Sequence, residues 1–351
     1  MRRIGGFVLA LLLAFAPGQG ALGETARYKA SFFDVFDTYS EIIVYAQSET
    51  EAQTILDKAH AELLTCHQLF DIYNLYDGMN NLKTVNDNAG VAPVKVDQRL
   101  IDLIAYAKQM EVETNGRMNI AMGSVLSIWH TYREAGINDP AVAALPPMAD
   151  LQAAAEHTDI HNIIVDTAAS TLYLSDPAMS LDVGAIAKGF SVERVAQELI
   201  AGGVTSALLS IGGNVRSIGM RGDGTSWRVN VQNPDLNAAE QSLTTLDLKD
   251  LSLVTSGSYQ RYYTVNGKQY HHIIDPDTLM PAEFVWAVSV VTQDSGLADA
   301  LSTALFNLSI EDGKTLLQNY PNTEALWVTL DGQIVRSDGF SALAGEEIPA
   351  A

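Results

Sequence analysis

The chain has 351 residues, of which 47% are apolar and 18% charged, so it can bury a full core and is not intrinsically disordered. Its 42 acidic residues against 21 lysines and arginines give a net charge of −21, which argues against a protein that coats nucleic acid or binds anionic membranes. A single cysteine, Cys66, rules out a disulfide framework and a cysteine-rich zinc site within this chain.

Residues 1–23 have the pattern of an export signal peptide. Arg2 and Arg3 precede an apolar run over 4–16, and Pro17 and small residues follow. The run of about 13 residues is too short to span a membrane as a helix, which needs roughly 20. We therefore expect cleavage near residue 23 and a soluble, exported mature protein, periplasmic or otherwise extracytoplasmic. The arginine pair also fits the start of a twin-arginine signal.

The first half of the remaining chain is predicted to be mainly helical after an initial pair of strands. Alternating aromatic and β-branched residues predict two strands within 28–46, and an apolar stripe at helical spacing predicts a helix over 50–70. Residues 74–97 lack periodicity and are rich in Asn, Asp and Gly, which predicts a long loop. The elements expected next are helices at 98–114 and 120–134 and an Ala/Pro-rich connection, a candidate subdomain joint, at 138–148.

The second half is predicted to be rich in short strands. Asn266-Gly267 between two alternating runs is a strong signal for a type I′ hairpin. The other expected elements are strands at 162–166, 171–174, 179–183, 207–211, 215–218 and 285–292, helices at 191–201, 296–308 and 310–319, and a hairpin around Asp331-Gly332. Because hairpins join most strands and helices occur in separate runs, the fold class is α+β rather than doubly wound.

Two glycine-containing segments are candidates for ligand binding. Residues 182–189, Asp-Val-Gly-Ala-Ile-Ala-Lys-Gly, lie where a strand is expected to turn into a helix, and the N–H groups of a helix N-terminus favour phosphate. Their spacing matches neither the P-loop nor GxGxxG, and an ordinary strand-to-helix turn also explains them. Gly212-Gly213-Asn214 is a turn that allows positive φ, and by itself it indicates structure more than function.

Two further segments carry histidines and oxygen ligands. His271 and His272 follow the hairpin, where alternation directs them to opposite faces, so one can face a site while the other meets solvent. Asp299, Ser302 and Thr303 lie at i, i+3 and i+4 of a predicted helix and point the same way. This oxygen-only set suits Mg²⁺ rather than zinc. Alternatively, Asp299 stabilises the start of the helix and the hydroxyls merely pack.

In combination these segments resemble the motifs of one family, the FAD:protein FMN transferases, or ApbE family. The matching segments, in chain order, are 36–38, 70–73, 114–123, 182–189, 211–214, 255–259, 272–276 and 298–300. The resemblance covers about residues 30–335. It implies an ApbE-like, T-fold-related α+β core, rich in strands and flanked by helices, with two intimately packed subdomains in a single flavin transferase module over 24–351.

The resemblance also implies an activity and its site. Such enzymes use FAD and Mg²⁺ and transfer FMN through a phosphoester bond to a Ser or Thr of an acceptor flavoprotein, releasing AMP. The implied flavin contacts are Phe36, Tyr73, Arg117, Met118 and Asn119, and the implied dinucleotide contacts are Asp182, Lys188 and Ile274. The implied metal ligands are Asp299, Thr303 and the backbone carbonyl of Ala185, and the implied catalytic residues are His272 and Asp299. Asn119 and Ser302 stand where many or some relatives have an acid.

Three functions remain open. The transferase is the first, an Mg²⁺-dependent FAD pyrophosphatase that yields FMN and AMP is the second, and a non-catalytic exported flavin-binding protein is the third. A binding protein has no need of the Asp299 and Thr303 pair, which disfavours the third. The chain lacks the acceptor pattern Asp-Gly-x-x-[Ser/Thr]-Gly-Ala-[Thr/Ser], so we expect it to act on a separate protein. Neither nucleic acid nor a membrane span is expected.

Overall fold

The computed structural model describes residues 25–343, so the predicted export signal lies outside the described residues. The α-helices are α1 (Glu49–Phe70), α2 (Leu82–Asp87), α3 (Gln98–Glu113), α4 (Gly123–Asn138), α5 (Met148–Ala155), α6 (Ala187–Ala201), α7 (Ser295–Phe306) and α8 (Ile310–Leu317). The strands are β1 (Ala26–Phe32), β2 (Ser40–Ala46), β3 (Val94–Lys95), β4 (Ile163–Asp166), β5 (Thr171–Leu174), β6 (Ala207–Ile211), β7 (Asn214–Ile218), β8 (Trp227–Gln232), β9 (Ser242–Leu248), β10 (Ser252–Gly257), β11 (Tyr262–Val265), β12 (Lys268–His271), β13 (Ala287–Thr292), β14 (Glu324–Val328) and β15 (Ile334–Arg336).

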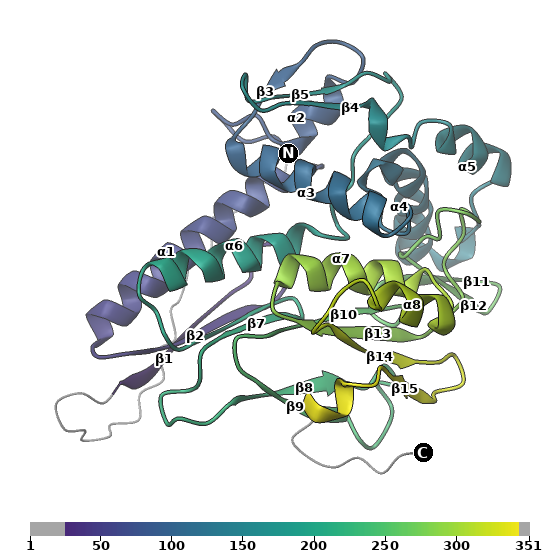
Figure 1. Ribbon diagram of the computed structural model, residues 1–351. Coiled ribbons are helices and arrows are strands. Elements are labelled where there is room, and N and C mark those ends of the chain that lie inside the picture. Colours follow the sequence, from purple (N-terminus) through teal and green to yellow (C-terminus); the bar gives the residue numbers. More distant parts are fainter. Residues whose placement is uncertain (1–24, 344–351) are drawn as a thin grey trace.

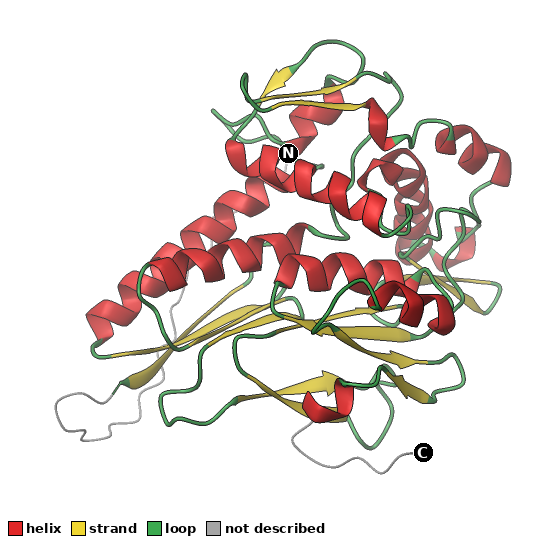
Figure 2. Ribbon diagram, viewed as in Figure 1, coloured by secondary structure: helices red, strands yellow, loops and turns green. Residues whose placement is uncertain are grey.

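An eight-stranded antiparallel sheet forms the base of the molecule, in the order β1-β2-β6-β7-β10-β13-β14-β15. Helices α1, α6 and α7 cover one face, and the β8–β9 hairpin packs on the other (Figure 1). Every residue of β13 is buried, because helix and hairpin side chains cover both of its faces. Figure 2 shows this separation of helical and strand layers, which confirms the predicted α+β class.

The remaining helices and a small sheet lie above the helical layer (Figure 1). Strands β3, β5 and β4 form this sheet, and its Leu172 and Leu174 share one apolar core with Ile104 of α3 and Leu301 of α7. The β11–β12 hairpin packs against α4, where the Tyr263 hydroxyl donates to the Ala144 carbonyl at 3.0 Å. The upper part and the main sheet are therefore joined through buried side chains. Within the described part, no helix is both long and apolar enough to cross a membrane.

Most elements expected from the sequence are present, but helix α5 and strands β8, β9 and β10 were not expected, and two expected regions differ. The segment 74–97 is not a continuous loop, since it holds α2 and β3. Asn81 and Thr84 form a capping box that starts α2, which gives this Asn-rich segment a short helix. The strand expected at 179–183 does not form: the Leu181 N–H donates to the Asn86 side chain and the Asp182 N–H to the Ile120 carbonyl, so no neighbouring strand is used.

Helices α6 and α7 approach each other closely at Gly189. A Cβ atom at this position would lie 2.2 Å from the Ser295 carbonyl oxygen and 2.5 Å from the Asp299 Cβ atom, so a side chain does not fit. Glu193 of α6 also accepts the Ser295 N–H at 2.9 Å and pairs with the buried Arg216 of β7 at 2.9 Å. These contacts fix the first turn of α7 against α6 and the sheet.

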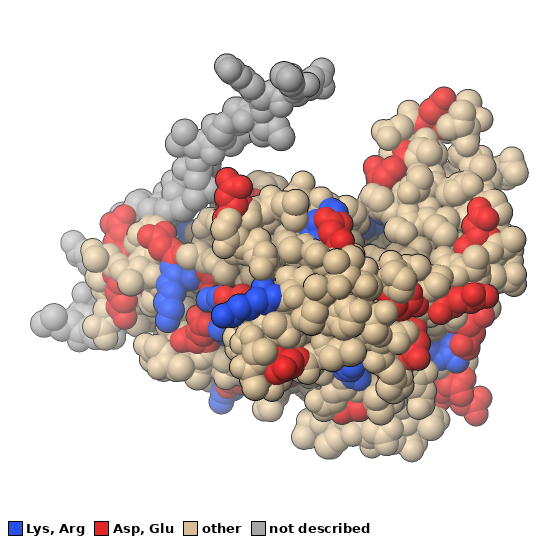
Figure 3. All heavy atoms as spheres, turned by 90° about the horizontal axis from the view of Figure 1, so that it is seen from above, with Lys and Arg blue, Asp and Glu red and all other residues tan. Residues whose placement is uncertain are grey.

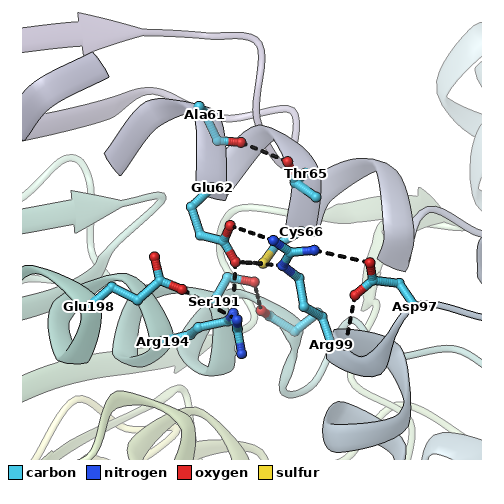
Figure 4. A network of polar contacts seen from close by, with 10 residues as sticks. Ala61, Glu62, Thr65, Cys66, Asp97, Arg99, Ser191, Arg194 and Glu198 are labelled. Atoms are coloured by element: carbon cyan, nitrogen blue, oxygen red, sulfur yellow. Dashed lines mark hydrogen bonds and ion pairs between the residues drawn. The ribbon is translucent and has the colours of Figure 1, made fainter. Parts of the chain in front are cut away.

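Charged side chains on the surface are mostly acidic. Seen from above, Asp and Glu are spread over the face, whereas Lys and Arg occur in a few small groups (Figure 3). A network of polar contacts that includes two arginines ties α1, α3 and α6 together (Figure 4). Glu62 of α1 accepts the Nε–H groups of Arg99 and Arg194, each at 2.7 Å. Burial alone raises the pKa of Glu62, but the bonds from the two arginines outweigh it and hold that pKa below its ordinary value.

Candidate active site

A cavity of about 430 Å³ is lined by residues of the main sheet, the start of α6, α7 and the upper part of the molecule. Its wall comes from segments far apart in sequence, namely those around residues 36–38, 70–74, 116–133, 182–188, 212–214, 255–261, 272–276 and 299–307. These segments include all of the motifs that the sequence singled out. A cavity of this size with convergent polar groups is the type of site that binds a small molecule or cofactor.

The structure brings together the residues predicted to bind or act, with one exception. Those that line the cavity are Phe36, Tyr73, Arg117, Asn119, Asp182, Ala185, Lys188, His272, Ile274, Asp299 and Thr303. The exception is Met118, which is fully buried in the core and does not line the cavity. Its side chain packs inward between two cavity residues, so the flavin contact predicted for it does not fit this structure.

Asp299 lies at the base of the cavity, on the first turns of α7. Asp299 is 4% exposed, and its carboxylate accepts the Gly189 N–H at 2.8 Å. Burial raises the pKa of Asp299, and the nearby charge of Lys188 and the Gly189 N–H oppose that shift. Thr303, one turn further along α7, lines the same wall, whereas Ser302 turns away and bonds to the Ser256 hydroxyl at 2.7 Å. Asp299 and Thr303 are thus available to one ligand.

The chemistry of this wall fits a hard cation that is shared with a substrate. Asp299, Thr303 and Ala185 offer a carboxylate, a hydroxyl and a backbone carbonyl to the same cavity, and all of these are oxygen donors. The described residues contain no group of three His, Cys, Asp or Glu side chains that would hold a metal ion without a substrate. In addition, the side chain of Asn214 is buried in this lining beside Asp299 and helps to oppose the rise in the pKa of Asp299.

The two adjacent histidines face different surroundings, as alternation predicts. His272 lines the cavity, and its Nδ1 atom lies 3.2 Å from the Arg261 carbonyl, to which it donates in the neutral form. This bond leaves Nε2 as a proton acceptor. Burial and the positive charges of Arg261 and Arg133 lower the pKa of His272 to about 3. His271 does not simply meet solvent: it is half-buried, and its ring packs edge-on against Phe306 at 5.4 Å.

Aromatic and basic side chains form the mouth of the cavity. Tyr73 is 58% exposed, and its ring lies 5.3 Å from that of His130 on α4. The Nδ1 atom of His130 is 2.8 Å from the guanidinium of Arg133. Asp182 lies below them and accepts the Gly184 N–H at 2.8 Å, and burial raises its pKa despite that bond. The mouth thus presents an aromatic face beside a group of cations.

Backbone strain marks the side of the cavity that Phe36 lines. Phe36 and Asp37 both have φ near +50°, which is a costly conformation for residues with a side chain. The Phe36 N–H donates to Nδ1 of His67 at 3.2 Å, and a Cβ atom at Gly212 would lie 2.7 Å from the Thr38 methyl group. The Gly212-Gly213 turn is therefore required so that the Phe36–Thr38 segment can pack closely against it.

Two predicted flavin contacts are already engaged by the protein. Arg117 pairs with Asp275 at 3.3 Å and with Asp277 at 2.6 Å, so its charge is neutralised. Asn119 accepts the Ala121 N–H at 2.8 Å and donates to the Thr158 carbonyl at 3.1 Å. Both of its polar atoms are therefore used within the protein. These two residues shape the wall of the cavity.

Sequence reasoning missed several cavity residues, among them His130, Arg133 and Arg261. His130 and Arg133 are three residues apart on α4 and therefore lie on one helical face, but the sequence does not say which face meets the cavity. Arg261 follows the Thr-Ser-Gly-Ser-Tyr segment and precedes β11. The signal available for Arg261 was its charge and its position between the 255–259 and 272–276 motifs.

Comparison with known proteins decides the family. The model of the ApbE family matches residues 36–327. The chain belongs to the ApbE family. Among curated ApbE relatives, the "FAD:protein FMN transferase" of Treponema pallidum (strain Nichols) is 34% identical over 94% of this chain and 93% of its own length. The protein of that name from Klebsiella pneumoniae (strain 342) is 30% identical over 84% and 87%.

A solved structure agrees with the ApbE assignment. The crystal structure of the ApbE protein from Thermotoga maritima is 28% identical to this chain, with a TM-score of 0.79, and the match covers 92% of this chain and 100% of that one. The family predicted from the ordered motifs is therefore confirmed, and with it the α+β fold and the transferase class of enzyme.

Proposed function

We propose that this protein transfers FMN from FAD to a Ser or Thr hydroxyl of an acceptor flavoprotein. The observation that carries the proposal is the meeting of His272, Asp299 and Thr303 in one cavity with the start of α6. In the proposed reaction the acceptor oxygen forms a bond to the phosphorus of the FMN half, the bond from that phosphorus to AMP breaks, and the hydroxyl proton leaves. The products are a phosphoester-linked FMN and free AMP.

His272 is the residue that accepts the proton. Its Nδ1–H is held by the Arg261 carbonyl, so the free Nε2 lone pair belongs to the neutral form, and the low pKa keeps that form populated. FAD brings negative charge into the cavity, which offsets the effect of Arg261 and Arg133 on His272. Binding of substrate therefore raises the pKa of His272 and makes the imidazole a stronger base.

Asp299, Thr303 and the Ala185 carbonyl are the residues that would hold Mg²⁺, which when bound neutralises charge on the diphosphate. Lys188 lies beside Asp299 and adds a positive charge at the same end of the cavity. The N-terminus of α6 lies there as well, and the positive end of its dipole favours an anion, although the Ala187 and Gly189 N–H groups already donate to the Val183 carbonyl and to Asp299. This end is therefore suited to the diphosphate, and Tyr73 and Phe36 offer aromatic faces to the ring systems.

The decisive experiment combines the protein with FAD, Mg²⁺ and a purified acceptor domain. We expect the intact mass of the acceptor to rise by that of FMN less water, with AMP formed in equal amount. A variant of the acceptor with its target Ser or Thr changed to Ala is the control. If FMN and AMP accumulate free while the acceptor mass stays the same, the protein is a pyrophosphatase. If FAD binds unchanged, it is a flavin-binding protein.

We further propose that the protein works outside the cytoplasm. The basic, apolar and small-residue order of residues 1–23 supports this. N-terminal sequencing of the protein recovered from an exporting host is expected to begin near residue 24. Recovery of the intact N-terminus from the cytoplasm would contradict the proposal.

A further inference from the structure

Two histidines of α1 hold the loop that joins β1 to β2. His60 and His67 are seven residues apart, which is two helical turns, so they face the same side of α1. The His60 ring lies 4.5 Å from that of Phe32, and its Nε2 atom is 2.9 Å from the Asp34 carboxylate. The His67 ring meets the Phe36 ring edge-on at 5.6 Å. Of these two histidines, His67 lines the cavity and His60 does not.

His67 bonds to the backbone at the strained point of this loop. Phe36 and Asp37 follow each other with φ of 51° and 50°, a conformation that residues with a side chain rarely adopt. The Phe36 N–H donates to Nδ1 of His67 at 3.2 Å, and within residues 25–343 it has no other partner. Val35, just before the turn, is fully buried in the core that α1 shares with the sheet. The turn therefore sets where the Phe36 ring lies, and His67 supports the turn.

We propose that His67 is a positioning residue: it holds the Phe36 ring in the cavity wall, where the ring packs on FAD. The inference rests on the proposed function, in which FAD is the ligand of this cavity. Strained backbone beside a ligand persists only where neighbouring contacts hold it, and this bond is such a contact. Without the bond, the turn relaxes toward negative φ and the ring leaves the wall in most molecules. FAD then binds tightly only to the fraction that retains the turn, which lowers its apparent affinity.

A direct bond from His67 to FAD is the alternative, and it uses the other ring nitrogen. Nδ1 accepts the Phe36 N–H, so in the neutral ring the proton is on Nε2. Nε2 has no hydrogen-bond partner among the described residues, and the half-buried ring is part of the cavity lining. Asn and Gln side chains separate the two roles. The amide of Asn reaches the place of Nδ1, whereas the amide of Gln, one carbon further out, reaches the place of Nε2.

The test measures the Kd for FAD by flavin fluorescence in His67→Leu, His67→Gln and His67→Asn. We expect His67→Leu and His67→Gln to raise the Kd about tenfold, which is the effect of retaining the turn in about one molecule in ten. His67→Asn keeps an acceptor for the Phe36 N–H, and its Kd is expected within about threefold of wild type. His60→Leu is the matched control, because it removes a contact to the same loop outside the cavity. Its Kd stays within about twofold of wild type.

A double-mutant cycle shows whether His67 acts through Phe36. Phe36→Leu removes the ring and raises the Kd for FAD, and adding His67→Leu is expected to raise it no further. Additive effects would overturn the inference, as would an unchanged Kd in His67→Leu or rescue by Gln in place of Asn. Circular dichroism and melting curves establish that each variant is folded. Should His67→Leu not fold, the comparison of His67→Asn with His67→Gln decides.

Binding and transfer are measured separately, so the two proposals fail separately. A wild-type protein that binds FAD but transfers nothing to an acceptor overturns the proposed function, and the Kd values still decide the role of His67. A wild-type protein that does not bind FAD overturns both.

Discussion

Burial of the Asp299 carboxyl group makes stability and activity change in opposite directions on substitution. The pKa of Asp299 in the folded protein is raised above the ordinary 3.8. Its contribution to the free energy of unfolding is therefore most favourable below pH 3.8 and is lost as the pH rises through the pKa of the folded protein. Asp299→Asn keeps an acceptor for the Gly189 N–H and removes the buried charge. We expect an equal or higher Tm in EDTA at pH 7. Turnover falls by at least ~10²-fold if charge neutralisation supplies several kcal/mol.

Thr303→Val is the matched milder variant, since it removes only a hydroxyl and added Mg²⁺ should restore part of its turnover. The competing explanation, in which Asp299 merely stabilises the start of α7, requires a lower Tm with normal turnover per folded molecule. Melting curves and Mg²⁺ titrations on the two variants separate these explanations. Near-normal turnover of Asp299→Asn at low Mg²⁺ would exclude Asp299 as a metal ligand.

The low pKa of His272 predicts an unusual pH dependence. In the free enzyme the imidazole stays neutral down to about pH 3. The kcat/KM for FAD, which reports on the free enzyme, therefore shows no inflection near pH 6.5. Bound FAD raises the pKa of His272, so the inflection in kcat lies at a higher pH than any in kcat/KM. His272→Gln removes proton transfer, and turnover falls ~10²-fold or more. An inflection in kcat/KM near pH 6.5 that disappears in this variant would show that His272 titrates normally in the free enzyme.

At the scale of elements, the contact between α6 and α7 is the one that tolerates the least change in side-chain size. Gly189→Ala places a methyl group against the Ser295 carbonyl and Asp299, so the helices must separate. We expect a loss of about 1–3 kcal/mol in the free energy of unfolding, the usual cost of overpacking. Turnover falls further than stability explains, because Asp299 moves. Denaturant titration and activity of the folded fraction measure the two effects. A fully stable and active Gly189→Ala would contradict the packing described here.

The sequence predicted elements where one physical signal dominated. Helices α1 and α7 have long apolar stripes, and the β11–β12 hairpin has Asn266 and Gly267, which both adopt positive φ as a type I′ turn requires. Strands β8, β9 and β10 were missed, although β8 alternates apolar and polar residues; β10 is a short buried run without alternation. Helix α2 depends on a cap at Asn81 rather than on periodicity.

At the scale of the whole molecule, the site is assembled by topology. Phe36 and Thr303 lie at opposite ends of the chain and line one cavity because β2 and β13 belong to one sheet. The spacing of these residues in the sequence does not predict that they lie close together. The resemblance to the ApbE motifs, in their chain order, did predict it. It did not give the place of Arg133 in the cavity lining, nor the burial of Met118, since both depend on how α4 and its preceding turn are oriented.

The Glu62 network is a test of how α1, α3 and α6 hold together. Because the pKa of Glu62 is lowered, its stabilisation is complete above the ordinary 4.5 and is lost as pH falls through the folded value. Glu62→Gln leaves Arg99 and Arg194 without their shared carboxylate, at a cost on the order of 2 kcal/mol at pH 7. The difference from wild type narrows below about pH 4. Denaturant titrations at both pH values check this, and a difference independent of pH would argue for a packing effect.

The single thiol has a practical consequence. Cys66 is fully buried, and burial together with the charge of Glu62 raises its pKa to about 12, so it is unreactive toward alkylating reagents in the folded protein. A cysteine introduced on the exposed hairpin beside the mouth, for example Tyr262→Cys, would be the sole labelling position. A fluorophore attached there gives a direct optical signal for the arrival and departure of a protein partner, without modifying the native cysteine.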